Sequence, residues 1–87
     1  MQTVKQQINL DYLERLSTLH ESANDILGDI IMAQRAVEDL EEGQENIRTL
    51  FGKTDGELAF EIVTEKRNVK RLRRSYLKIM DQINATL

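Results

Sequence analysis

The chain has 87 residues, of which 40% are hydrophobic and 31% charged, and it contains neither proline nor cysteine. Cysteine-based disulfides and thiolate chemistry are therefore excluded, and the apolar runs are too short for a membrane-spanning helix. The scarcity of turn residues argues against sheets, and the N-terminus does not resemble a signal peptide. We expect one all-α domain, residues 1–87, in the cytoplasm.

The first predicted element is a long helix over about residues 4–51. Its apolar residues follow a seven-residue repeat with one unbroken phase, which is typical of coiled-coil packing. Because the phase continues across Gly28, we expect a continuous helix. The alternative is a break near Gly28 that folds residues 5–27 back as the third helix of a three-helix bundle. The a and d positions include Tyr12, Leu16, Leu19, Ala23, Ile26, Ile30, Ala33, Val37, Leu40, Gln44, Ile47 and Phe51.

A glycine-bracketed loop follows the first helix. Gly52 is well placed to end that helix, and either Thr54 or Asp55 can cap the next one. The second helix is predicted over about residues 56–86 and has the same repeat. Its a and d positions are Leu58, Ile62, Glu65, Val69, Leu72, Tyr76, Ile79, Ile83 and Thr86.

The two repeats predict a long antiparallel hairpin in which each a position meets a d position. The layer nearest the loop then joins Phe51 to Leu58. In the same register the two polar seam residues, Gln44 and Glu65, meet each other and can share a hydrogen bond. We expect this polar layer to penalise slipped registers.

Charge is divided unevenly between the two helices. Residues 1–52 hold four Lys or Arg and ten Asp or Glu, a net of −6, whereas residues 53–87 hold eight and five, a net of +3. Complementary arms of one hairpin explain this division, and we expect Glu41 to lie close to Lys66 across the seam.

The second helix also carries a cationic ridge on its predicted outer side. Such a ridge suits an acidic protein surface, a phosphorylated ligand or nucleic acid, although the overall charge of −3 argues against a general nucleic-acid binder. Partial neutralisation by Glu38, Glu42 and Glu45 is the plainer interpretation. The ridge residues are Arg67, Lys70, Arg71, Arg74 and Lys78.

Apolar residues remain after the seam is filled. The first helix is longer than the second, so residues 1–22 are expected to project past the open end with an apolar face that includes Val4 and Ile8. A bare hairpin buries little surface, so we expect a homo-oligomer, a dimer or larger. The predicted oligomer interface comprises Leu10, Leu13, Leu16, Leu19, Leu27, Ile31, Leu77 and Met80.

No residue pattern indicates catalysis, a cofactor or a metal. The single histidine, His20, has no second ligand at helical spacing, and the carboxylates form a charge run rather than an isolated pair. The sequence favours a non-enzymatic interaction protein that regulates, adapts or inhibits a protein partner. Anion or nucleic-acid binding through the cationic ridge is the alternative.

Overall fold

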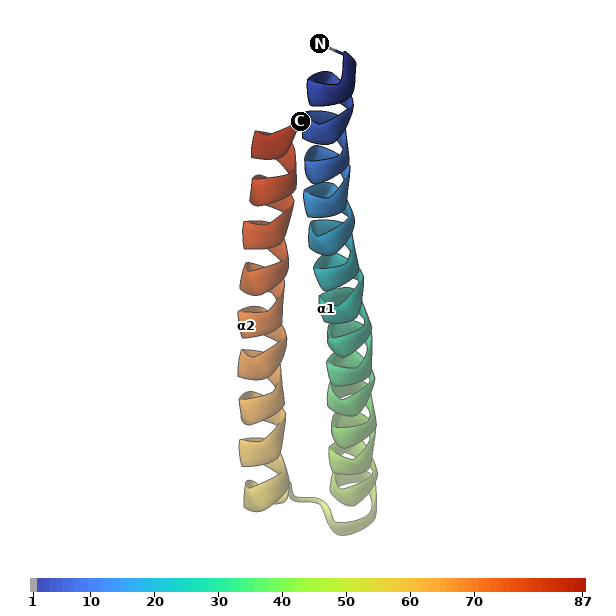
Figure 1. Cartoon of the computed structure of the whole chain (residues 1–87). Helices are drawn as coiled ribbons and strands as arrows, with labels where there is room; N and C mark the ends of the chain where they lie inside the picture. The colour runs from blue at the N-terminus through green and yellow to red at the C-terminus, as the bar shows by residue number, and fades with distance from the viewer. Residues whose placement is uncertain (1) are drawn as a thin grey trace.

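The computed structural model describes residues 2–87 and the side chains of residues 10–87. It is an all-α hairpin made of α1 (Gln2–Phe51) and α2 (Gly56–Thr86), two long helices that run antiparallel (Figure 1). The molecule is a rod measuring 75 × 15 × 14 Å. The predicted helices and their connection are confirmed.

The helix ends follow the chemistry expected from the sequence. Gly52 has a φ of 71°, and its N–H donates to Arg48 O at 2.8 Å, which closes the last turn of α1. Asp55 is the N-cap of α2, where its Oδ1 accepts from Leu58 N at 3.0 Å. Helix α1 passes through Gly28 without interruption, so the alternative three-helix bundle does not form.

The seam between the helices is the one that the seven-residue repeat predicts. Every described a and d position is buried or half-buried, with one exception. That exception is Phe51, which is 69% exposed. The buried hydrophobic residues are Ala23, Ile30, Ala33, Val69 and Ile83.

The exposure of Phe51 follows from the register, which differs from the predicted one. Leu58 Cδ2 lies 3.8 Å from the position that a Cβ on Gly43 would occupy. Leu58 therefore packs beside Gly43, about one heptad away from its predicted partner Phe51. A slide of one heptad keeps a positions opposite d positions, so both registers satisfy the apolar pattern equally well.

The predicted hydrogen bond between Gln44 and Glu65 is wrong for the same reason. The Gln44 amide instead bonds to the backbone of Asp55, accepting from its N–H and donating to its carbonyl, each at 3.0 Å. Glu65 is half-buried and lines a shallow groove with Ala36 and Leu40. The polar seam residue of α1 thus holds the loop in place.

The slide also brings α2 further along α1 than expected. Its C-terminus lies beside the N-terminal part of α1 (Figure 1), and Leu16 and Leu19 are half-buried. The projection predicted for residues 1–22 is therefore shorter, and Val4 and Ile8 lie outside the described side chains. No helix within residues 2–87 has the length and apolar character needed to cross a bilayer.

Candidate functional site

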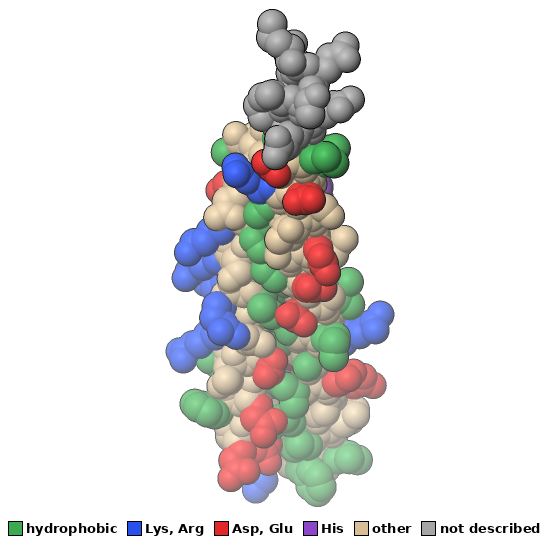
Figure 2. All heavy atoms as spheres, viewed as in Figure 1, with side chains coloured by type: hydrophobic (Ala, Val, Ile, Leu, Met, Phe, Trp, Pro, Cys, Tyr) green, Lys and Arg blue, Asp and Glu red, His purple; other side chains and the backbone are tan. Residues whose placement is uncertain are grey.

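The predicted cationic ridge lies on the exposed side of α2. The segment 66–78 contains seven Lys or Arg and no Asp or Glu, and all seven cationic side chains are exposed. In the face shown in Figure 2, Lys and Arg gather along the edge formed by the middle of α2, whereas Asp and Glu lie along α1 and at the turn end of the hairpin. The structure therefore brings the five predicted ridge residues onto one helix surface.

Direct neutralisation of this ridge is slight. The ion pairs found among the side chains of residues 10–87 are Lys66–Glu41 at 2.9 Å and Arg48–Glu45 at 3.0 Å. The first confirms the expected contact between the arms, while the second lies within α1. Neither involves Arg67, Lys70, Arg71, Arg74 or Lys78, and Arg71 donates to Asn68 Oδ1 at 2.7 Å. Glu38, Glu42 and Glu45 thus form no ion pair with the ridge.

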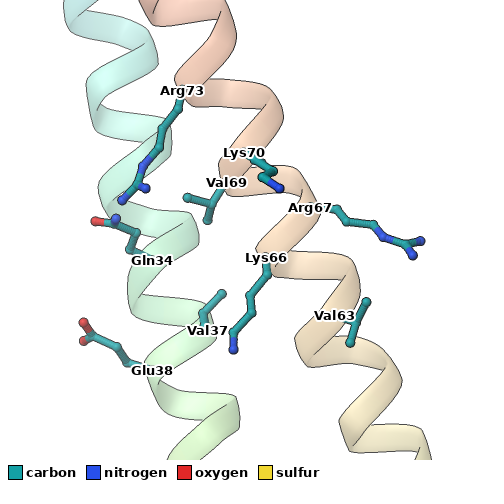
Figure 3. Close-up of a pocket in the computed structure, with 9 residues that line it drawn as sticks. All are labelled: Gln34, Val37, Glu38, Val63, Lys66, Arg67, Val69, Lys70 and Arg73. Atoms are coloured by element: carbon teal, nitrogen blue, oxygen red, sulfur yellow. The ribbon is translucent and has the colours of Figure 1, made fainter.

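An open groove runs beside the ridge, between the helices (Figure 3). Val37 and Val69 line its floor. Lys66, Lys70 and Arg73 supply positive charge from α2, and α1 contributes Gln34 and Glu38. The close-up shows Arg73 directed toward α1 and Arg67 directed away from the groove. Its volume of about 630 Å³ is open to solvent along the rod.

The same side of the hairpin becomes apolar toward the open end. Leu27 precedes the groove residue Gln34 by one heptad, and Ile31 precedes Glu38 by the same interval. On α2, Leu77 follows Lys70 by one heptad. Residues seven apart share a helix stripe, so these side chains extend the groove lengthwise. We call this side the groove face.

The predicted oligomer residues divide into two groups. Leu10 and Leu13 are each 58% exposed and Leu77 is 60% exposed, while Leu27 and Ile31 are less so. Leu16 and Leu19 are half-buried, because the shifted register brings the end of α2 alongside this part of α1. Met80 on α2 is also half-buried. The exposed members all lie on the groove face by heptad position.

Two exposed aromatic rings at the turn end were not predicted as surface features. Phe51 was expected in the seam, and Phe60, which is 71% exposed, lies outside the a and d positions. Leu50, which precedes Phe51 in the sequence, is 75% exposed. The exposure of Phe60 could have been predicted from the sequence, because Phe60 lies outside the a and d positions. The exposure of Phe51 could not, because it depends on the register.

Within the described residues, no three His, Cys, Asp or Glu side chains gather closely enough to hold a metal ion. His20 is exposed on α1. The arrangement therefore offers extended surfaces, one cationic and one mixed apolar and charged, on a two-helix rod. Comparison with known proteins gives no match to a family model, to a curated protein or to a solved structure.

Proposed function

We propose that the chain is a non-enzymatic helical interaction protein of the cytoplasm, which regulates, adapts or inhibits an acidic protein partner. The cationic ridge supplies the binding surface. The observation that supports this proposal is the set of exposed cations at residues 67–78, which make no ion pair with the side chains of residues 10–87. Cations left without partners attract acidic surfaces and accelerate their encounter.

The proposal includes self-association into a dimer or larger oligomer. Only five hydrophobic residues of the described part are buried, while eleven large hydrophobic side chains are exposed. A two-helix rod of this size gains little stability from its own seam. Association would cover the groove face, including Lys70, and leave Arg67, Arg71, Arg74 and Lys78 on the outer surface of α2 free for the partner.

Two variants of the chain, each lacking three positive charges, test the ridge. The ridge variant combines Arg67→Gln, Arg71→Gln and Arg74→Gln, and the control combines Arg15→Gln, Arg35→Gln and Lys53→Gln. All six residues are exposed, so both variants lose three positive charges without disturbing the seam. Circular dichroism should show the same helix content for wild type, variant and control.

Immobilised wild type, variant and control are then used to capture proteins from a cell extract, identified by mass spectrometry. At least one acidic protein should bind wild type and control but not the ridge variant. That protein, once purified, should bind wild type with an affinity that falls as salt rises. The same captured proteins on all three baits would contradict the proposal.

The alternative function is binding of nucleic acid or a phosphorylated ligand at the same ridge. It is favoured by the absence of any acidic residue from segment 66–78. Five phosphate contacts to duplex DNA give a slope of about −4.5 for log K against log salt. Titration of a labelled DNA duplex with the protein, followed by fluorescence anisotropy at several salt concentrations, measures this slope. If the anisotropy of the duplex does not change on addition of protein at 50 mM salt, the nucleic-acid alternative is wrong.

A further inference from the structure

We infer that the groove face is the docking site for a second copy of this chain, with α1 of each hairpin lying against α2 of the other. The two hairpins point in the same direction and are related by a two-fold axis along the rod. This inference deepens the proposed self-association and rests on it.

Charge complementarity selects this arrangement. On the groove face, Glu38 and Glu41 belong to α1, whereas Lys66, Lys70 and Arg73 belong to α2. Rotation by 180° about the long axis places α1 of one copy over α2 of the other. In the register that places Leu58 beside Gly43, Glu38 of each copy then lies within one helical turn of the level of Lys66 of its partner, at both edges of the interface.

The apolar half of the face matches itself under the same rotation. In the register that places Leu58 beside Gly43, Leu27 on α1 of one copy lies within one helical turn of the level of Leu77 on α2 of the other, and Ile31 lies level with Lys70. Leu27 is 37% exposed, Ile31 49% and Leu77 60%, so each loses water-accessible surface when the copies join. A continuous stripe of these residues extends the core of each hairpin into a four-helix bundle.

An antiparallel arrangement, in which the two hairpins point in opposite directions, is less favourable. It places α1 against α1 and α2 against α2. With full overlap, the acidic helix α1 of one hairpin faces α1 of the other, and the basic helix α2 faces α2. Like charges across an interface repel each other, so this arrangement is disfavoured. Partial overlap at the open ends avoids this repulsion but leaves the groove beside Val37 and Val69 uncovered.

The available area is adequate for a stable dimer. Helix α2 has 31 residues, which gives a shared length of about 45 Å at the α-helical rise. With a rod width near 15 Å, the groove face offers ~700 Å² per copy. Specific protein interfaces bury about 600–1,000 Å² on each partner, so burial of the whole face reaches this range.

Disulfide trapping tests the geometry, because the chain has no cysteine of its own. Leu58 packs beside Gly43, and the helices are antiparallel. Moving 26 residues from each of these positions toward the open end reaches Ser17 and Asn84. These two exposed residues therefore lie at one level, and both belong to stripes of the groove face.

Chains carrying Ser17→Cys and chains carrying Asn84→Cys, one of them isotope-labelled, are mixed and oxidised. The inference predicts a disulfide between unlike chains in excess over either like-chain product. A dominant link between two Ser17→Cys chains would indicate α1 against α1 and would overturn the inferred geometry.

Light scattering separates failure of the geometry from failure of self-association. Wild type should have twice the 10.1 kDa chain mass. The double variant Ile31→Lys with Leu77→Lys should be monomeric with its helix content retained. The control Met32→Lys with Phe60→Lys, which changes two exposed residues off the groove face, should remain dimeric. A wild-type monomer overturns both this inference and the proposed self-association, and the ridge is then tested independently by the capture experiment.

Discussion

The side chain of Gln44 and the backbone of Asp55 form a two-point contact in which the amide accepts from the Asp55 N–H and donates to its carbonyl, each at 3.0 Å. Asp55 is also the N-cap of α2. One residue of the α1 seam therefore fixes the position of the first turn of α2. The contact sets the axial position along α1 at which α2 begins, and therefore the register of the hairpin.

Replacement of Gln44 by alanine removes both hydrogen bonds. The contact is exposed, so water can reach the freed groups, and we expect a loss of about 1–2 kcal/mol in the free energy of unfolding. Urea unfolding followed by circular dichroism measures this change. Gln82→Ala is the matched control, because Gln82 is exposed and its side chain makes no hydrogen bond in the described part of the chain. Equal midpoints for both variants would contradict the anchoring role.

The register illustrates what the repeat could and could not predict. Helix bounds, caps and seam positions follow from local chemistry and from a repeat of seven, and they agree with the structure except at Phe51, which is exposed. The axial position of one helix against the other does not follow from that repeat, because a slide of one heptad restores every a-to-d layer. The distinguishing contact, Gln44 with Asp55, involves backbone atoms that a side-chain pattern does not represent.

Two glycines should respond to alanine in opposite ways. Gly28 is exposed within α1 and has no atom within 4 Å of the added Cβ, so Gly28→Ala should stabilise the helix by about 1 kcal/mol. Gly52 has equally open surroundings but a φ of 71°, which strains any residue with a side chain. Gly52→Ala should cost about 1 kcal/mol. Thermal unfolding at one protein concentration compares the two, and a rise in Tm for both would refute the assigned backbone strain.

The cap of α2 gives a third stability prediction. Asp55→Ala removes the acceptor that the Leu58 N–H uses at 3.0 Å, and we expect a cost of about 1 kcal/mol. Asp55→Asn keeps an acceptor oxygen and should lose much less. Asp39→Ala, at an exposed position within α1, controls for removal of a carboxylate. Chemical denaturation of the three variants should rank Asp55→Ala as the least stable, and any other order would argue against the cap.

Sequence patterns located the cationic ridge more successfully than the apolar surface. Arg67, Arg71 and Arg74 lie on the outer side of α2 whatever the register, since helical spacing alone determines their direction. The exposure of Leu16 and Leu19 depends instead on how far α2 extends along α1. The predicted exposed apolar surface was therefore too large around Leu16 and Leu19. It was too small at the turn end, where Leu50 and Phe51 are exposed.

Alanine substitution at Phe51 and at Ile83 distinguishes the two registers in solution. In the structure Phe51 is 69% exposed and Ile83 only 3% exposed. Phe51→Ala should therefore change the free energy of unfolding by less than about 1 kcal/mol, as should the control Phe60→Ala at a ring that is 71% exposed. Ile83→Ala removes buried methyl groups and should cost about 2–4 kcal/mol.

The register predicted from the repeat gives a different result for the same variants. Packing of Phe51 on Leu58 would bury the ring, and its removal would cost about 3 kcal/mol or more. Urea unfolding of the three variants at matched protein concentration decides between these outcomes. If Phe51→Ala were as damaging as Ile83→Ala while Phe60→Ala remained neutral, α2 would have to lie one heptad closer to the end of α1, and Gln44 would be free to meet Glu65.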